Sequence, residues 1–378
     1  MTDLTAYTAD NPHEFALGIC ANLRETLGVD VLPILTSPAV PEPERIRRAA
    51  GLLLEGILDR ADREQLNDFL SDPTDPAENP TIAWLLGLPA VPGAIEPEPN
   101  MAISEKDALT LQGYEGQKVY DYVFTLTKRF ELMATSTTVG QLVAQMAAGA
   151  VISVGVPMAV GVIKALRAGS KLLAAMKLGI TGIGMKTAIT AVVVVLAALL
   201  FYLLYENPKK ILGVVINNTD ENFAVARWDQ AGGNLHMEHG EMVNFMQDNS
   251  DGLDSPTLQL KQRVSFGPGD PDNIVFAGFY FADRNIGFRG AEGVAVFTST
   301  TSSLSWAHMF AVPYTSDNGT NARWLDTPPD DLSKLYRDMY DSRKTRVDFT
   351  SNSFRFVSTV NNARGGVVAC IAAINGPQ

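Results

Sequence analysis

The chain has 378 residues and carries 30 Lys and Arg residues against 42 Asp and Glu residues, a net charge of −12. This excess of acid excludes nucleic acid as the main partner, because binding a phosphate backbone requires a basic surface. The length suggests two or three domains. The charge is uneven: residues 1–100 hold a net −11, residues 101–210 a net +5 and residues 211–378 a net −6.

Residues 1–100 are predicted to form a small acidic helical domain. Asn11 and Pro12 indicate the start of a helix that continues to Leu27. Apolar spacing predicts a second helix over residues 44–70. The proline-rich residues 89–100 read as the linker that ends this domain. One hypothesis is that the acidic domain masks the basic region that follows it and is autoinhibitory, and the alternative is an ordinary solvated surface.

Residues 101–210 are dominated by two runs without any charged side chain, residues 132–163 and residues 187–205. The second run is 19 residues long, about the length of a helix that crosses the bilayer core. We therefore predict an apolar helical hairpin that inserts into a membrane, with a buried bundle core as the alternative. The residues predicted to insert are Val151, Val156, Val160, Val192, Val193, Val194, Leu199, Leu200 and Phe201.

A basic connector separates the two apolar runs. It contains no acidic residue, and its bases are Lys164, Arg167, Lys171, Lys177 and Lys186. Such residues favour anionic lipid headgroups. The chain starts with MTDLTAYTADNPHEF, which has neither the basic nor the apolar region of a signal peptide. We therefore expect a soluble form that is released without a signal peptide and acts at the membrane of a target cell.

Residues 211–378 change to short apolar runs with turn signals between them, which is typical of an antiparallel β-sandwich. One short helix is predicted over residues 330–340. The predicted strands cover residues 212–216, 223–228, 258–266, 274–281, 293–299, 304–312, 353–360 and 366–374. The fold class is therefore α+β and multidomain, with an N-terminal helical region, an apolar helical hairpin and a C-terminal β-sandwich.

The sequence offers no motif for catalysis. It has no nucleophile elbow, no phosphate-binding loop and no dinucleotide fingerprint, so we expect no enzyme and no cofactor. His236 and His239 have a spacing that metal ligands can use, but we interpret them as surface residues and expect no metal. Cys20 and Cys370 are interpreted as buried free thiols, with a disulfide left open.

Aromatic residues gather late in the chain. Trp306 and Phe310 alternate within a predicted strand and are expected in the core. Tyr336 and Tyr340 are four residues apart and share one face of the predicted helix. They could hold a choline-like cation between their rings, or they could be core residues.

Residues 290–324, GAEGVAVFTSTTSSLSWAHMFAVPYTSDNGTNARW, and residues 330–341, DDLSKLYRDMYD, resemble the centre of the actinoporin family. That resemblance covers about residues 211–376. Actinoporins are soluble cytolysins with a β-sandwich that bind sphingomyelin and assemble pores from a detached helix. The resemblance implies a headgroup site at Pro313, Tyr336 and Tyr340. We add Tyr314 and Trp324, since both ring types suit the headgroup layer of a membrane.

Two departures leave the target open. Ala311 stands where the family has a headgroup-binding serine, and Asp341 replaces a third tyrosine. The partner is therefore a phosphocholine-headgroup lipid or sphingolipid, another lipid, a glycan or a protein.

Together these features predict a pore-forming cytolysin whose sandwich docks on a target membrane and whose apolar helices insert and self-associate. One alternative is an integral membrane protein with an external sandwich. The other is a soluble, lectin-like module that binds lipid or glycan.

Overall fold

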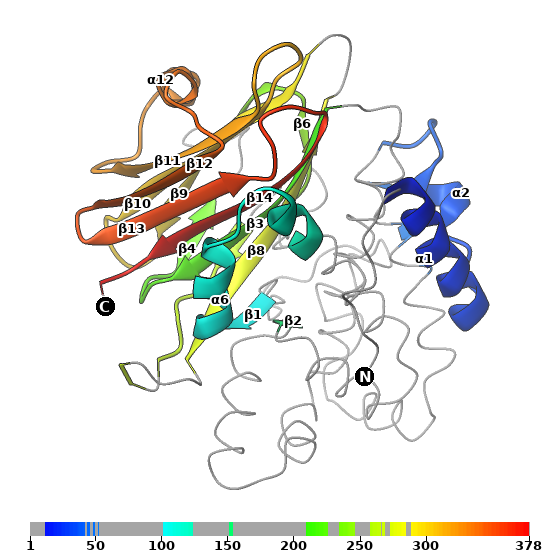
Figure 1. Ribbon diagram of the computed structural model, residues 1–378, viewed down its shortest axis with the longest axis horizontal. Helices are drawn as coiled ribbons and strands as arrows, with labels where there is room; N and C mark the ends of the chain where they lie inside the picture. The colour runs from blue at the N-terminus through cyan, green and yellow to red at the C-terminus, as the bar shows by residue number, and fades with distance from the viewer. Residues whose placement is uncertain are drawn as a thin grey trace, which may run out of the picture. The chain divides into compact units, whose positions relative to one another are not determined.

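The computed structural model describes residues 12–41, 44–45, 48–49, 52, 101–123, 151–153, 209–225, 234–245, 258–265, 267–268, 273–284 and 289–377 (Figure 1). The chain forms two compact units. The first contains Met1–Ala102, Thr125–Tyr205 and Asp248–Asp254. The second contains Ile103–Phe124, Glu206–Gln247 and Ser255–Gln378.

The first unit begins with helix α1 (Pro12–Leu27), which confirms the predicted start and end of this helix. Gly28 ends it with φ at 73°, and its N–H donates to the carbonyl of Arg24 at 2.9 Å. A glycine adopts this left-handed backbone conformation without a Cβ clash. A short helix, α2 (Leu32–Leu35), follows. The buried residues of α1 include Ala16, Ile19, Cys20 and Leu23, at helical spacing.

The predicted hairpin is corrected at one position. Val151 lies in a short strand, β2 (Val151–Ser153), and not in a helix. The β-branched Val151 and Ile152 favour extended backbone, and Gly149 and Gly155 flank them in the sequence. The remaining predicted insertion and connector residues lie outside the described residues: Val156, Val160, Lys164, Arg167, Lys171, Lys177, Lys186, Val192, Val193, Val194, Leu199, Leu200 and Phe201.

Across the described ranges, no helix is both long and apolar enough to span a membrane. The membrane-inserting hairpin therefore stays a prediction.

The second unit is a sandwich of two sheets, as the strand pattern predicted. The first sheet contains, in spatial order, β12 (Arg346–Ser351), β13 (Phe354–Val360), β14 (Val367–Asn375), β3 (Lys210–Asn218) and β8 (Ile274–Asp283), with β6 (Glu241–Phe245) also paired to β8. The second sheet contains β11 (Gly319–Leu325), β10 (Ser305–Val312), β9 (Ala291–Ser299), β4 (Phe223–Val225) and β7 (Leu258–Leu260), with β5 (Leu235–His239) also paired to β9.

One pairing corrects the prediction of an antiparallel sandwich. Strands β3 and β14 run parallel, from Lys210 opposite Val367 to Asn218 opposite Asn375. A parallel pair needs a long connection, and most of the sandwich lies between these two strands in the sequence. Both strands are central in their sheet and almost fully buried, which suits the continuous apolar runs of parallel strands.

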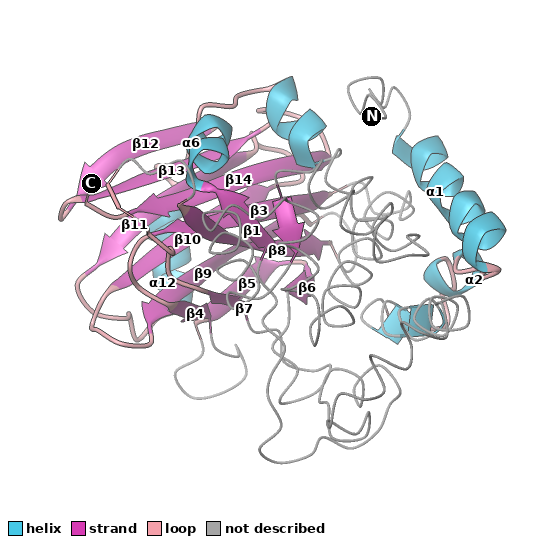
Figure 2. Ribbon diagram, turned by 90° about the horizontal axis from the view of Figure 1, so that it is seen from below, coloured by secondary structure: helices cyan, strands magenta, loops and turns pink. Residues whose placement is uncertain are grey.

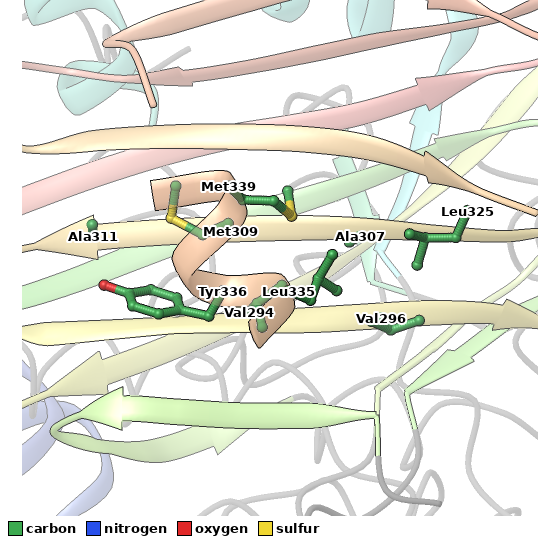
Figure 3. Packing of buried hydrophobic residues seen from close by; sticks show 9 residues of the cluster. All are labelled: Val294, Val296, Ala307, Met309, Ala311, Leu325, Leu335, Tyr336 and Met339. Carbon is green, nitrogen blue, oxygen red and sulfur yellow. The ribbon is translucent and has the colours of Figure 1, made fainter. Parts of the chain in front are cut away.

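Alternate residues of β10 pack on opposite faces of the second sheet. Trp306 and Phe310 are 0% and 1% exposed, which confirms their predicted place in the core. The Trp306 ring stacks on Phe297 at 4.5 Å and lies 6.0 Å from Phe356 of the other sheet. The other face of β10 is covered by helix α12 (Leu332–Tyr340). Figure 3 shows this second layer, which contains Val294, Val296, Ala307, Met309, Ala311, Leu325, Leu335, Tyr336 and Met339.

A helix from before the apolar runs covers the other sheet. Strand β1 (Met101–Ser104) leads into α6 (Glu105–Gln112), and α6 packs on β14, β3 and β8. Figure 2 shows α6 over the strands of the first sheet, and α12 packs on β5, β9, β10 and β11 of the second sheet. Ile103–Phe124 lies in the same compact unit as the sandwich, whereas residues 101–210 were predicted as one helical region.

Candidate functional site

Several loops meet at one end of the sandwich, which we call the Tyr314 end. The N–H of Lys210 donates to the carbonyl of Gly366 at 2.7 Å. The N–H of Asn318 donates to the carbonyl of Ala363 at 2.8 Å. The first bond lies within one sheet, and the second joins the loop before β11 to the loop between β13 and β14 of the other sheet. The described residues of this end are 209, 240, 284, 289–290, 313–318, 341–345 and 361–366.

Pro313 and Tyr314 follow β10 directly and belong to this end. Pro313 is buried, whereas the Tyr314 side chain is 40% exposed. Among the described residues, Tyr314 and Leu109 are the large hydrophobic side chains with such exposure. The ammonium nitrogen of Lys209 lies 6.0 Å from the Tyr314 ring centroid, which is within the range of a cation–π contact.

Tyr336 lies in the core and not on an open aromatic face. It is 3% exposed, and its hydroxyl donates to Oε2 of Glu292 at 2.7 Å. Glu292 itself is 5% exposed. Burial raises the pKa of the Glu292 carboxyl, against the opposing effect of the hydrogen bond from Tyr336. Burial and the neighbouring Glu292 raise the pKa of Tyr336 as well.

Tyr340 is half-buried, and its ring faces a cation of the chain itself. The guanidinium carbon of Arg343 lies 3.6 Å from the Tyr340 ring centroid. The Tyr340 hydroxyl and the Ser316 hydroxyl are hydrogen-bonded at 2.9 Å. The Tyr336 and Tyr340 rings are 5.5 Å apart, so they do share one face as predicted. Arg343 occupies a ring face that the sequence analysis assigned to a choline-like cation.

Arg343 also fastens the loop of residues 313–318 to the end of α12. It donates to the carbonyl of Asp317 from Nε and Nη2 at 3.2 and 3.1 Å, and to the Ser316 hydroxyl at 3.1 Å. A Cβ on Gly319 would lie 2.8 Å from Cγ of Arg343, so a larger residue at this position would displace the Arg343 side chain. Sequence reasoning missed Arg343, although a base three residues after Tyr340 near a helix C-terminus is a known favourable position.

Trp324 is separated from the other predicted headgroup residues. It was predicted as a headgroup residue together with Tyr314, but it lies in β11 opposite Trp306. It is half-buried, stacks on Phe354 at 5.2 Å and donates from Nε1 to Asp326 at 3.1 Å. β11 starts at the Tyr314 end with Gly319, and five residues of strand place Trp324 about 17 Å further along.

The two histidines lie on β5, under α12. His236 Nε2 is 2.9 Å from Oε2 of Glu238, which also accepts a hydrogen bond from Ser333 of α12 at 3.4 Å. Both histidines are half-buried, where the sequence analysis expected surface residues. Within the described residues, no three His, Cys, Asp or Glu side chains are arranged to hold a metal ion.

No protein-family model matches the chain, and no curated protein sequence matches it. Three solved structures are similar to part of this chain at low identity. The lipid-binding protein Nakanori shares 11% identity over 44% of this chain and 71% of its own, at a TM-score of 0.30. The Xerocomus chrysenteron lectin XCL shares 10% identity over 44% of this chain and 99% of its own, at a TM-score of 0.24. RahU protein shares 12% identity over 45% of this chain and 96% of its own, at a TM-score of 0.23. Such TM-scores do not define a common site.

Proposed function

We propose that the C-terminal sandwich is a non-enzymatic module that docks on membrane lipid through the Tyr314 end. The observation that carries this proposal is the exposed Tyr314 ring at the end of a well-packed sandwich, with the Lys209 ammonium beside it. An apolar ring with a polar tip suits the headgroup layer of a membrane. A neighbouring cation suits the phosphate groups of that layer.

The loop that carries Tyr314 is held on two sides. Arg343 binds it to the end of α12. The side chain of Asn318 donates to Asn362 at 3.2 Å and to the Gly365 carbonyl at 3.1 Å, in the loop between β13 and β14. A loop that is already ordered loses less conformational entropy when it binds a surface.

Vesicle flotation tests the proposal with Tyr314→Ala. We expect a loss of about tenfold in partitioning, because an exposed aromatic ring no longer reaches the interface. Leu109→Ala is the matched control, since Leu109 is 37% exposed on α6, away from this end, and it should bind like the wild type. If Tyr314→Ala binds vesicles of phosphatidylcholine, sphingomyelin and phosphatidylserine as tightly as the wild type does, the proposal is contradicted. Capture on immobilised glycans without vesicle binding would make the module a lectin.

Pore formation is a second candidate, favoured by the charge-free run of residues 187–205. Lys209, the first described residue after this run, lies beside Tyr314. An apolar segment that joins the sandwich at its docking end would start close to the bilayer. Release of a trapped dye from vesicles tests this candidate, with cross-linking to detect self-association. Wild-type protein that binds vesicles but releases no dye would leave docking in place and exclude the pore.

A further inference from the structure

The two ends of the sandwich carry opposite charge. In the described loop residues of the Tyr314 end, the acidic residues are Asp317 and Asp341. The basic residues of the same loops are Lys209, Arg284, Arg289, Arg343, Lys344 and Arg364. Six bases against two acids give these loops a net charge of +4. This excess is unusual in a chain whose net charge is −12.

The opposite end is acidic. Its described loop residues are 219–222, 261–265, 267–268, 273, 300–304, 326–331, 352–353 and 376–377. Their bases are Lys261 and Arg263, and their acids are Asp220, Glu221, Asp326, Asp330 and Asp331. Two bases against five acids give a net charge of −3. The difference between the ends makes the sandwich an electric dipole along its strands.

The strand residues nearest the Tyr314 end do not cancel its positive charge. Lys210 and Asp283 lie opposite each other in the β3–β8 pair and offset one another. Glu241 and Glu292 also lie at strand ends here, as does Arg346 at the start of β12, and counting all three as charged still leaves this end with a net charge of +3. The ion pair between Arg364 and Asp317 at 2.8 Å lies at an exposed position and involves one base and one acid. Removing this pair from the count leaves five bases and one acid among the same loops.

We propose that the Tyr314 end recognises an anionic lipid surface, and that the charge difference turns this end toward the bilayer before Tyr314 enters it. This inference rests on the proposed docking function and names its lipid class. Each Lys or Arg near an anionic bilayer strengthens binding by about fivefold. The acidic end is repelled by the same surface, so binding with the opposite orientation is disfavoured. A cage for a choline cation is not needed in this arrangement, since Arg343 already covers Tyr340.

The experiment uses the full chain and vesicles of phosphatidylcholine with and without phosphatidylserine. The wild type should bind the anionic vesicles much more tightly, and added salt should weaken the binding. Arg289→Gln and Lys344→Gln remove exposed charges at the Tyr314 end. Each is expected to weaken binding to the anionic vesicles about fivefold. The matched control is Lys106→Gln, an equal loss of charge at an exposed position at the start of α6, and it should stay within about twofold.

Each outcome decides between orientation, lipid class and docking. Equal losses for Lys106→Gln and Arg289→Gln would show a response to net charge alone and overturn the orientation. Equal binding of the wild type to neutral and anionic vesicles would overturn the lipid class, while docking itself stands. No binding to either vesicle would reject the docking function as well. Circular dichroism of each variant confirms that a loss of binding is not a loss of fold.

Discussion

At the scale of single residues, Arg343 is the side chain on which the candidate site depends most. Its planar guanidinium covers Tyr340 and bonds to Ser316 and Asp317 at the same time. A lysine carries the same charge, but it has no planar fork to satisfy these acceptors. Arg343→Lys is therefore expected to lower the free energy of unfolding by about 1 to 2 kcal/mol.

Urea denaturation measures this loss. The matched control is Arg337→Lys at an exposed position of the same helix, where the change should be small. Arg343→Lys keeps the positive charge, but its binding to vesicles should still weaken, because the loop that carries Tyr314 loses its attachment to residue 343. Unchanged stability would show that the loop is held by other contacts.

His308 makes a prediction about pH. It is 1% exposed between the sheets, and its Nε2 lies 3.0 Å from the Tyr280 hydroxyl. Burial lowers its pKa from 6.5 to about 4. Above pH 6.5 the imidazole is neutral in both states; between pH 6.5 and 4 the unfolded chain binds a proton that the folded chain does not. The free energy of unfolding therefore decreases as the pH is lowered from 6.5 to 4, by about 3 kcal/mol in total.

The variant His308→Gln has no titrating ring at this position. Its unfolding free energy should depend less on pH in the same window than that of the wild type, even though it starts lower at neutral pH. Urea titrations of both proteins at a series of pH values give the difference directly. Parallel pH profiles would show that His308 takes up its proton without loss of the fold.

The tertiary contacts of Tyr336 and Tyr340 show which part of the candidate site could not be predicted from the sequence. The spacing of Tyr336 and Tyr340 correctly predicted a shared face. What fills that face depends on Glu292 and Arg343, which reach it through the packing of α12 on β9 and through the loop after α12. A helical spacing rule contains neither of these tertiary contacts.

At the scale of elements, helix α12 was predicted correctly from local sequence signals. Residues 330–340 were predicted as helical, and α12 covers Leu332–Tyr340. Asp331 is its N-cap, and the carboxylate accepts a hydrogen bond from the N–H of Lys334 at 2.9 Å. Asp331→Ala should lower the unfolding free energy by about 1 kcal/mol, and Asp331→Asn should retain most of it. Thermal unfolding compares the two, and equal losses would mean that charge and not capping is responsible.

Other strands had sequences without the apolar pattern that predicts a strand. Strands β5, β6, β11 and β12 were not predicted. In β11, GTNARWL mixes polar and apolar residues because α12 covers only part of it. In β12, RVDFTS has half-buried and exposed positions at the edge of its sheet. The strands that were predicted, such as β3 and β8, are buried on both faces and read as continuous apolar runs.

At the scale of the whole molecule, a segment from before the apolar runs completes the sandwich. Gln112 of α6 and Asn375 of β14 exchange amide hydrogen bonds at 3.0 and 2.8 Å across 263 residues of sequence. Asn375 also accepts from Asn218 at 3.1 Å. All three side chains are buried. No sequence pattern marks such a pairing, since each amide reads as an ordinary polar residue near the end of an element.

Gln112→Ala tests whether this segment is part of the folding unit. The substitution removes the acceptor of one N–H of the buried Asn375 amide and opens a small cavity, so we expect a loss of about 2 to 3 kcal/mol in unfolding free energy. Gln117→Ala is the matched control, because Gln117 is exposed and its amide donates to Oδ1 of Asp121 at 2.8 Å, near the surface. Urea denaturation can be followed by tryptophan fluorescence, to which Trp306 in the core of the sandwich and Trp324 on β11 contribute two of the four tryptophans. If Gln112→Ala unfolds like the control, the segment of residues 103–124 rests on the sandwich without stabilising it. If it is destabilised as expected, the chain that enters and leaves the apolar runs is fixed to the sandwich on both sides.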